Sequence, residues 1–248
     1  MGAIMRGRLL AGVLVVSALL AALAVACGGG GDDGEATVVP SPGTTGTPAA
    51  TPTAIPSALE EQLGGMVVQL SDLPAGFSVA EESFSTNEEV AGEGEDAAEV
   101  LAKLTEWRRI LGHGVVYSSE ASDASGVLLV DSTVSLYESD SGAVASFADA
   151  VTTARATDWA GSAGETTDVQ VEEISPLDVG DEMLWMRITG TAVFGDPAAE
   201  QPFVQDVVLL RVGRVRGSVS IVSAAADVAL LVEGMVHTQA ANMAAGLQ

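Results

Sequence analysis

The segment "RVGRVRGSVSIVS", Arg211 to Ser223, decides the fold class of this chain. Its apolar residues Val215, Val219 and Ile221 alternate with arginines and serines, and a period of two is typical of a β-strand. Gly213 tolerates the positive φ that a tight turn requires, so the segment predicts a hairpin with the apolar run that precedes it. A hairpin of this kind makes the neighbouring strands antiparallel.

Working outward, the segment "VLLVDSTVSLYES", Val127 to Ser139, alternates in the same way. The pattern predicts a half-buried strand with Leu128, Val130, Val134 and Leu136 on one face and Asp131, Thr133 and Ser135 on the solvated face. Further strands are expected at residues 77–82, 115–119, 169–174, 183–194 and 203–212.

Three stretches have helical period. They are Glu95 to Gly112, with Gly112 as the stop signal; Asp140 to Arg155, with Val144, Phe147, Val151 and Ala154 on one face; and the segment from Asp227 to Leu247. The acidic segment from Phe84 to Glu99 is expected to be a solvated loop that leads into the first of these helices. The pattern predicts one α+β domain at residues 58–248. It has a mostly antiparallel sheet and about three helices, including a C-terminal helix packed on the sheet.

The N-terminal segment has the form of an export signal. Two arginines precede an uncharged run from Leu9 to Ala26, and small residues end that run. A spanning helix is the alternative interpretation, and both place the rest of the chain outside the cytoplasm.

The residues "LAVAC", Leu23 to Cys27, resemble the lipobox of bacterial lipoproteins. The resemblance implies cleavage after Ala26 and a lipid on Cys27, the only cysteine in the chain. Residues 1–26 are then the signal peptide, and residues 27–57, rich in glycine, threonine and proline, a flexible tether. We expect a lipid-anchored protein of the cell envelope, on the outer side of the cytoplasmic membrane.

The net charge of −24 argues against nucleic acid as a partner, because phosphate groups would be repelled. The negative charge is compatible with a cationic partner; the alternative is that the acidic residues only keep the domain hydrated. Neither a metal nor a cofactor is expected, because a zinc site needs more histidine and cysteine than the chain has. Acids near Glu93 to Glu99 and at Glu138 to Asp140 lack the spacing of a calcium loop, so solvation is favoured.

No motif indicates catalysis. His113 and His237 are expected to be ordinary surface or edge histidines, and the pair Asp181 and Glu182 is expected to form a turn that enters a strand. Trp159 and Trp185 are the candidate ligand-binding residues, since tryptophan can line a site for an apolar ligand. No catalytic residue is assigned.

The order of elements from Val127 to Leu247 resembles extracytoplasmic lipoprotein and sensor domains such as those of mycobacterial serine/threonine kinases. The resemblance implies a binding or sensing role with no catalytic residues. We therefore expect a non-enzymatic, membrane-anchored domain that binds an envelope partner or an apolar ligand. The alternatives are an extracytoplasmic hydrolase that uses carboxylates and a structural acidic surface protein. The sequence does not fix the oligomeric state.

Overall fold

The computed structural model describes residues 55–94, 96–119, 126–162, 166–194, 199–224 and 228–248. The predicted signal segment, Cys27 and the tether up to residue 54 lie outside the described residues. Within the described residues, no helix is both long enough and apolar enough to cross a bilayer.

A single seven-stranded sheet forms the centre of the fold, with the strand order β1-β2-β3-β7-β6-β5-β4. Every neighbouring pair is antiparallel. The strands are β1 (Phe77–Ser85), β2 (Arg109–Ser119), β3 (Val127–Tyr137), β4 (Thr166–Ile174), β5 (Glu182–Phe194), β6 (Ala199–Val212) and β7 (Val215–Ser223). The β6–β7 hairpin turns at Gly213, whose φ is +53°, as the sequence predicts.

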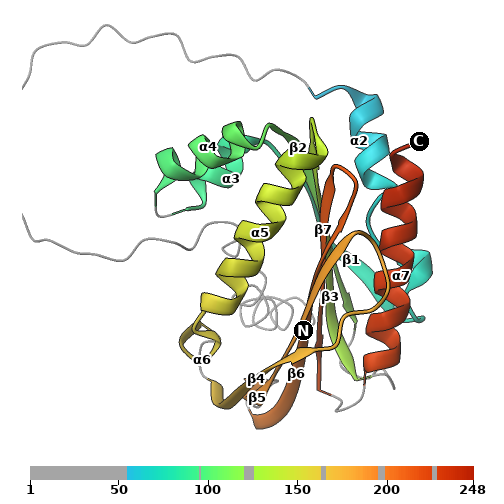
Figure 1. The fold of residues 1–248 in the computed structure, drawn as a ribbon. Helices are drawn as coiled ribbons and strands as arrows, with labels where there is room; N and C mark the ends of the chain where they lie inside the picture. Colours follow the sequence, from blue (N-terminus) through green and yellow to red (C-terminus); the bar gives the residue numbers. More distant parts are fainter. Residues whose placement is uncertain (1–54, 95, 120–125, 163–165, 195–198, 225–227) are drawn as a thin grey trace, which may run out of the picture.

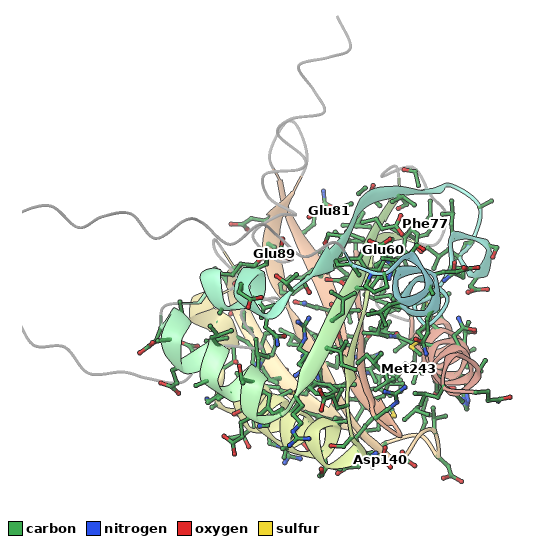
Figure 2. All side chains as sticks on the ribbon, turned by 90° about the horizontal axis from the view of Figure 1, so that it is seen from above. Glu60, Phe77, Glu81, Glu89, Asp140 and Met243 are labelled. Carbon is green, nitrogen blue, oxygen red and sulfur yellow. The ribbon has the colours of Figure 1, made fainter. Side chains whose placement is uncertain are left out.

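Helices cover both faces of the sheet (Figure 1). Helix α7 (Ala229–Gly246) and helix α2 (Ser57–Gly64) lie on one side, and α5 (Asp140–Ala156) crosses the other. Seen from above, α3 and α4 lie on the side opposite to α7 (Figure 2). The remaining helices are the 3-10 helix η1 (Leu70–Asp72), α3 (Asn87–Gly92), α4 (Ala97–Glu106) and α6 (Trp159–Ser162).

The larger core lies between the sheet and α7. A chain of hydrogen bonds joins this core to the segment that follows α2. The Val68 amide donates to Ser132 Oγ (3.0 Å), Ser132 Oγ donates to Gln239 Oε1 (3.2 Å), and Gln239 Nε2 donates to the Thr133 carbonyl (2.8 Å). Tyr117 also donates to the Val68 carbonyl (2.7 Å). These bonds satisfy polar groups that are buried under α7, so they fix how α7 and the entering chain sit on β3.

The smaller core lies under α5. Phe147 and Trp159 pack there against β5 and β6. The sequence predicts Val144 on the buried face of α5, but its side chain is 41% exposed. The helix instead buries small residues, among them Gly142, Ala143, Ser146 and Ala150, because it packs closely on the sheet. The expected number of about three helices is too low, since α2, α3 and α6 also form.

The helix predicted from Glu95 to Gly112 ends at Glu106. Arg108 has a φ of +53°, and the chain then continues as β2 from Arg109. Arg109, Leu111 and Gly112 pair with β3, and Gly112 also pairs with β1, so these tertiary hydrogen bonds outweigh the local helical period. Arg109 and Leu111 are therefore strand residues, and the prediction that Gly112 stops a helix is wrong.

The acidic segment predicted as a loop also contains regular structure. Its first residues complete β1, and α3 follows from Asn87 to Gly92. Thr86 and Glu89 form a capping box in which Thr86 Oγ1 accepts from the Glu89 amide (3.3 Å) and the Thr86 amide donates to Glu89 Oε2 (2.8 Å). The acids of the first turn therefore stabilise a helix end as well as being solvated.

Candidate binding site

A row of polar side chains crosses the face of the sheet that α5 partly covers. On β3 these are Asp131, Thr133 and Ser135, and the residues directly opposite them on β7 are Ser220, Ser218 and Arg216. Directly opposed residues in an antiparallel pair point to the same face, so these six form one surface, which we call the polar stripe. The hydroxyl groups of Thr133 and Ser218 hydrogen-bond each other (2.6 Å).

The sequence predicts β3 as a half-buried strand, and this is wrong. Asp131 is 7% exposed and Ser135 is also 7% exposed, although both lie on the face expected to be solvated. β3 is an inner strand of the sheet, and distant segments contact both of its faces: Val68 and α7 on one, and α5 on the other. Two of the three polar residues on this face of β3 are therefore buried, while Thr133 is half-buried.

Asp131 is the residue of the stripe with a buried side-chain atom that lacks a hydrogen bond within the described part of the chain. Its Oδ1 atom is buried and has no hydrogen-bond partner among the described residues. Burial, together with a smaller effect of the negative charge of Glu81 on β1, raises the pKa of the Asp131 carboxyl from 3.8 to about 7. A buried carboxylate oxygen without a donor costs about 1–3 kcal/mol or more, so this position favours either a proton or an incoming donor.

Solvent reaches the residues around Asp131. Thr133 and Ser218 on the stripe are half-buried, as are Gly114 and Val116 on the adjacent strand β2. Val116 lies directly between Asp131 and Glu81 across the β1–β2–β3 register, and Glu81 is exposed (Figure 2). Around Asp131 the stripe is thus half-exposed on its β2 side, while α5 contacts β3, β6 and β7, and α3 and α4 contact β2.

A guanidinium group closes one end of the stripe. Arg109 is 7% exposed, and its Nε donates to Ser135 Oγ (3.1 Å). Nη1 donates to the Ser85 carbonyl (3.0 Å) and to Asn87 Oδ1 (3.1 Å), and Nη2 donates to Ser85 Oγ (2.8 Å). The Arg109 side chain lies directly over Gly112: a Cβ atom at residue 112 would be only 2.0 Å from Arg109 Nη2. Burial lowers the pKa of Arg109 to about 10, so the group stays charged at neutral pH.

A second guanidinium lies beside it. Arg216 Nη1 donates to Ser146 Oγ on α5 (3.0 Å), and the same hydroxyl group hydrogen-bonds the Tyr137 hydroxyl (2.6 Å). Within the described ranges, neither Arg109 nor Arg216 forms an ion pair, whereas Arg108, Arg155, Arg187 and Arg211 each do. Two uncompensated cations thus meet at this end.

The residues predicted as sites lie elsewhere. Ala26 and Cys27 fall outside the described residues. Trp159 and Trp185 are buried, at 4% and 2% exposure, and their indole NH groups donate to the Ala154 carbonyl (3.1 Å) and to Asp206 Oδ1 (2.7 Å). A ligand role for the two tryptophans stays a prediction. Trp185 belongs to a buried cluster in which Arg187 makes a two-bond ion pair with Asp206.

His113 is not the surface or edge residue that the sequence predicts. It is 2% exposed within β2, stacks on Phe84 at 4.4 Å between ring centroids, and places Nε2 3.2 Å from Glu82 Oε1. The two glycines around it suggest a turn in the sequence, but both belong to β2. His237 is exposed on α7, as expected.

The acidic candidates do not form a metal site in the described part of the chain. Asp96 caps α4 by accepting from the Glu99 amide (3.0 Å), and Asp181 and Glu182 both bind Arg211. An open hollow of about 550 Å³ lies between the end of α4 and the start of α5, lined by residues that include Arg108, Ser139 and Ser141. Asp131, whose buried Oδ1 atom has no hydrogen-bond partner among the described residues, does not line this hollow. We therefore place the candidate site at the polar stripe.

Sequence reasoning missed Asp131, Arg109 and Arg216 as site residues. The alternation with apolar residues predicts a solvated position for Asp131, and the helical period places Arg109 near a helix end. One signal was available: hydroxyl residues alternate along both Val127–Tyr137 and Val215–Ser223, and these segments become neighbours in the sheet.

No family model matches the chain, and no curated protein matches it. A solved structure is similar to it. The extracellular domain of PknH from Mycobacterium tuberculosis shares 11% sequence identity with a TM-score of 0.48, and the match covers 80% of this chain and 99% of that chain. This neighbour is of the class that the sequence resemblance named. At this identity and TM-score, the likeness establishes neither a shared function nor a shared ligand.

Proposed function

We propose that this chain is a lipid-anchored extracytoplasmic protein whose domain binds a small polar molecule at the polar stripe and does not catalyse a reaction. The membrane is its first partner, through the lipid on Cys27, and residues 27–57 hold the domain away from the bilayer. The N-terminal sequence supports the anchor, and the stripe supports the binding role.

The observation that carries the binding role is the buried Oδ1 atom of Asp131, which lacks a donor among the described residues. Buried polar atoms in folded proteins are nearly always hydrogen-bonded, and an exception calls for an explanation such as strain, a functional role or a bound group. Hydroxyl groups of Thr133, Ser218 and Ser220 surround this carboxyl on the same face. Such a lining favours a hydrogen-bonding or cationic ligand over the apolar ligand expected from the sequence.

The binding role is tested with the full-length protein purified in detergent, compared with Asp131→Asn. Native mass spectrometry after incubation with a small-molecule extract of the envelope should detect a retained compound on the wild type and at least about tenfold less of it on the variant. Asp149→Asn is the matched control, since Asp149 lies on α5 with Lys103 as its partner at 3.6 Å. Equal retention by all three proteins would contradict the proposal.

The anchor is tested separately. Cys27→Ser should release the protein from the membrane fraction, and the intact mass of the wild type should correspond to a chain beginning at Cys27 with added acyl groups. A wild-type chain that begins at Met1 would contradict the lipoprotein assignment.

A carboxylate hydrolase is the second candidate, and one observation favours it. Asp131 can hold a proton near neutral pH, and exposed Glu81 lies two strands away on the same face, about 10 Å apart in the backbone. Two carboxyl groups about 6.5–9.5 Å apart can flank a scissile bond as acid and base, and side chains on this backbone spacing can reach such a separation. The same mass measurement distinguishes the roles, because a hydrolase would return a cleaved compound and Glu81→Gln would stop the cleavage.

A further inference from the structure

The polar stripe carries opposite charges at its two ends. Asp131 and Ser135 lie four residues apart on β3, and Arg216 is directly opposite Ser135 on β7. At about 3.3 Å per residue, the two ends are about 13 Å apart along the strand. The hydrogen-bonded pair of Thr133 and Ser218 lies halfway between them.

The positive end lacks a counter-charge in the described part of the chain. Arg109 and Arg216 lie on either side of Ser135, and the charge of Arg216 contributes to the lowered pKa of Arg109. Glu89 is the acid that raises that pKa, but it has the smallest effect of those acting on Arg109, and its carboxylate is bound to Thr86. An anion placed between the two guanidinium groups would remove this repulsion.

The two arginines have different roles at this end. Arg109 uses all three of its nitrogens to hold Ser85, Asn87 and Ser135, so it supplies charge and fixes the strands. The described hydrogen bonds of Arg216 all come from Nη1 and go to Ser146, and the side chain is half-buried. Its Nε and Nη2 atoms therefore supply the donors that an anion needs.

We propose that the polar stripe binds a short peptide with free ends, whose terminal ammonium group meets Asp131 and whose terminal carboxylate meets Arg216. This inference rests on the proposed binding function and names its ligand class. An ammonium group donates to the unpartnered Oδ1 atom, a carboxylate accepts from the guanidinium, and the middle hydroxyl groups face the peptide backbone. A peptide of three or four residues spans about 10–14 Å when extended, which matches the stripe.

The experiment titrates triglycine and tetraglycine into the full-length protein in detergent at pH 7.5 by calorimetry. Each peptide is compared with its N-acetylated and its C-amidated form. For the wild type, acetylation and amidation should each weaken binding by about tenfold or more, because each removes one charge-assisted contact.

Two variants test which end of the peptide meets Asp131 and which meets Arg216. In Asp131→Asn, N-acetylation of the peptide should weaken binding by less than about twofold, while C-amidation should still weaken it by about tenfold. In Arg216→Gln, the effects of the two modifications should be exchanged. Arg155→Gln is the matched control, because Arg155 is exposed on α5 and pairs with Glu173 at 2.8 Å. In this control, acetylation and amidation should each weaken binding as they do in the wild type.

Several results would overturn the inference. These results are a failure of triglycine and tetraglycine to bind below about 1 mM, equal binding of the free and the blocked peptides, and retention of both effects by both variants. If the envelope extract still yields a compound that depends on Asp131 while the peptides fail, the proposed function survives and the ligand class is wrong. If neither binds, both proposals fail. Should a variant not fold, the comparison of free and blocked peptides on the wild type decides.

Discussion

Asp131 lies directly opposite Ser220 across the β3–β7 pair, and its Oδ1 atom nevertheless has no hydrogen-bond partner among the described residues. Ser220 Oγ accepts from Gln205 Nε2 (3.3 Å) on the neighbouring strand β6. The Asp131 carboxyl group is therefore buried without a hydrogen-bond donor to its Oδ1 atom among the described residues. Its energetic effect should depend on pH, on a ligand, or on both.

The first prediction concerns the pH dependence of stability. The folded-state pKa of Asp131, about 7, lies above its ordinary value of 3.8, so the native protein holds a proton that the unfolded chain releases between these values. The unfolding free energy should therefore fall as pH rises from about 4 to 7, by at most about 1.4 kcal/mol per pH unit from this group. Asp131→Asn should lose this part of the slope and be more stable than the wild type at pH 8.

Urea titrations of both proteins between pH 4.5 and 8 measure the difference, and other acids cancel in the comparison. Glu81 is the charged group that acts on Asp131 across β2, so Glu81→Gln should shift the midpoint of the slope to lower pH. Parallel stability curves for wild type and Asp131→Asn would contradict the assignment.

The second prediction concerns the space under Arg109. In Gly112→Ala the new methyl group would meet Arg109 Nη2 at 2.0 Å and Ser85 Oγ at 2.7 Å, so the guanidinium has to leave its four hydrogen bonds. We expect a loss of about 2–4 kcal/mol in unfolding free energy. Gly114→Ala is the control on the same strand, because its Cβ would meet only Thr133 Cγ2 at 3.4 Å. Thermal unfolding of the two variants should separate them clearly, and similar losses would argue against the role of Gly112.

The third prediction compares a buried and an exposed ion pair. Asp206 is fully buried and accepts from Trp185 Nε1 (2.7 Å), Arg187 Nε (2.9 Å) and Arg187 Nη2 (3.0 Å). Asp206→Asn leaves the Arg187 charge uncompensated and should cost about 3–5 kcal/mol. Glu173→Gln breaks the exposed pair with Arg155 and should cost less than about 1 kcal/mol. Chemical denaturation measures both, and a small loss for Asp206→Asn would mean that the cluster is not held as described.

The fourth prediction concerns the contact between α7 and the sheet. A methyl group at Gly217 would lie 2.9 Å from both Gln239 Nε2 and Met243 Sδ, so Gly217→Ala should push α7 away from β7 and lower stability by about 1–3 kcal/mol. Met243 is fully buried at this contact (Figure 2). Gly234→Ala is the opposite case, since no atom lies within 4 Å and the position is inside α7. It should raise stability by about 0.5–1 kcal/mol, and hydrogen exchange of the α7 amides should report both changes.

Some elements were predictable because short-range chemistry specifies them. The alternation around Gly213 fixes the β6–β7 hairpin, since a glycine with positive φ between two alternating runs leaves few other local solutions. The apolar side of α7, with Met235, Val236 and Met243 buried, follows from the helical period in the same way.

The sequence by itself determined the antiparallel sheet and the final helix, because each depends on residues close together in the chain. Only the tertiary structure decided that β2 begins at Arg109, that His113 is buried, and that Asp131 is buried on a face expected to be solvated. The physical reason is that a period of two states which residues share a face, but distant segments decide what covers that face. The environment of a polar face is therefore a property of the packed sheet and its helices, and with it the charge and chemistry of the candidate site.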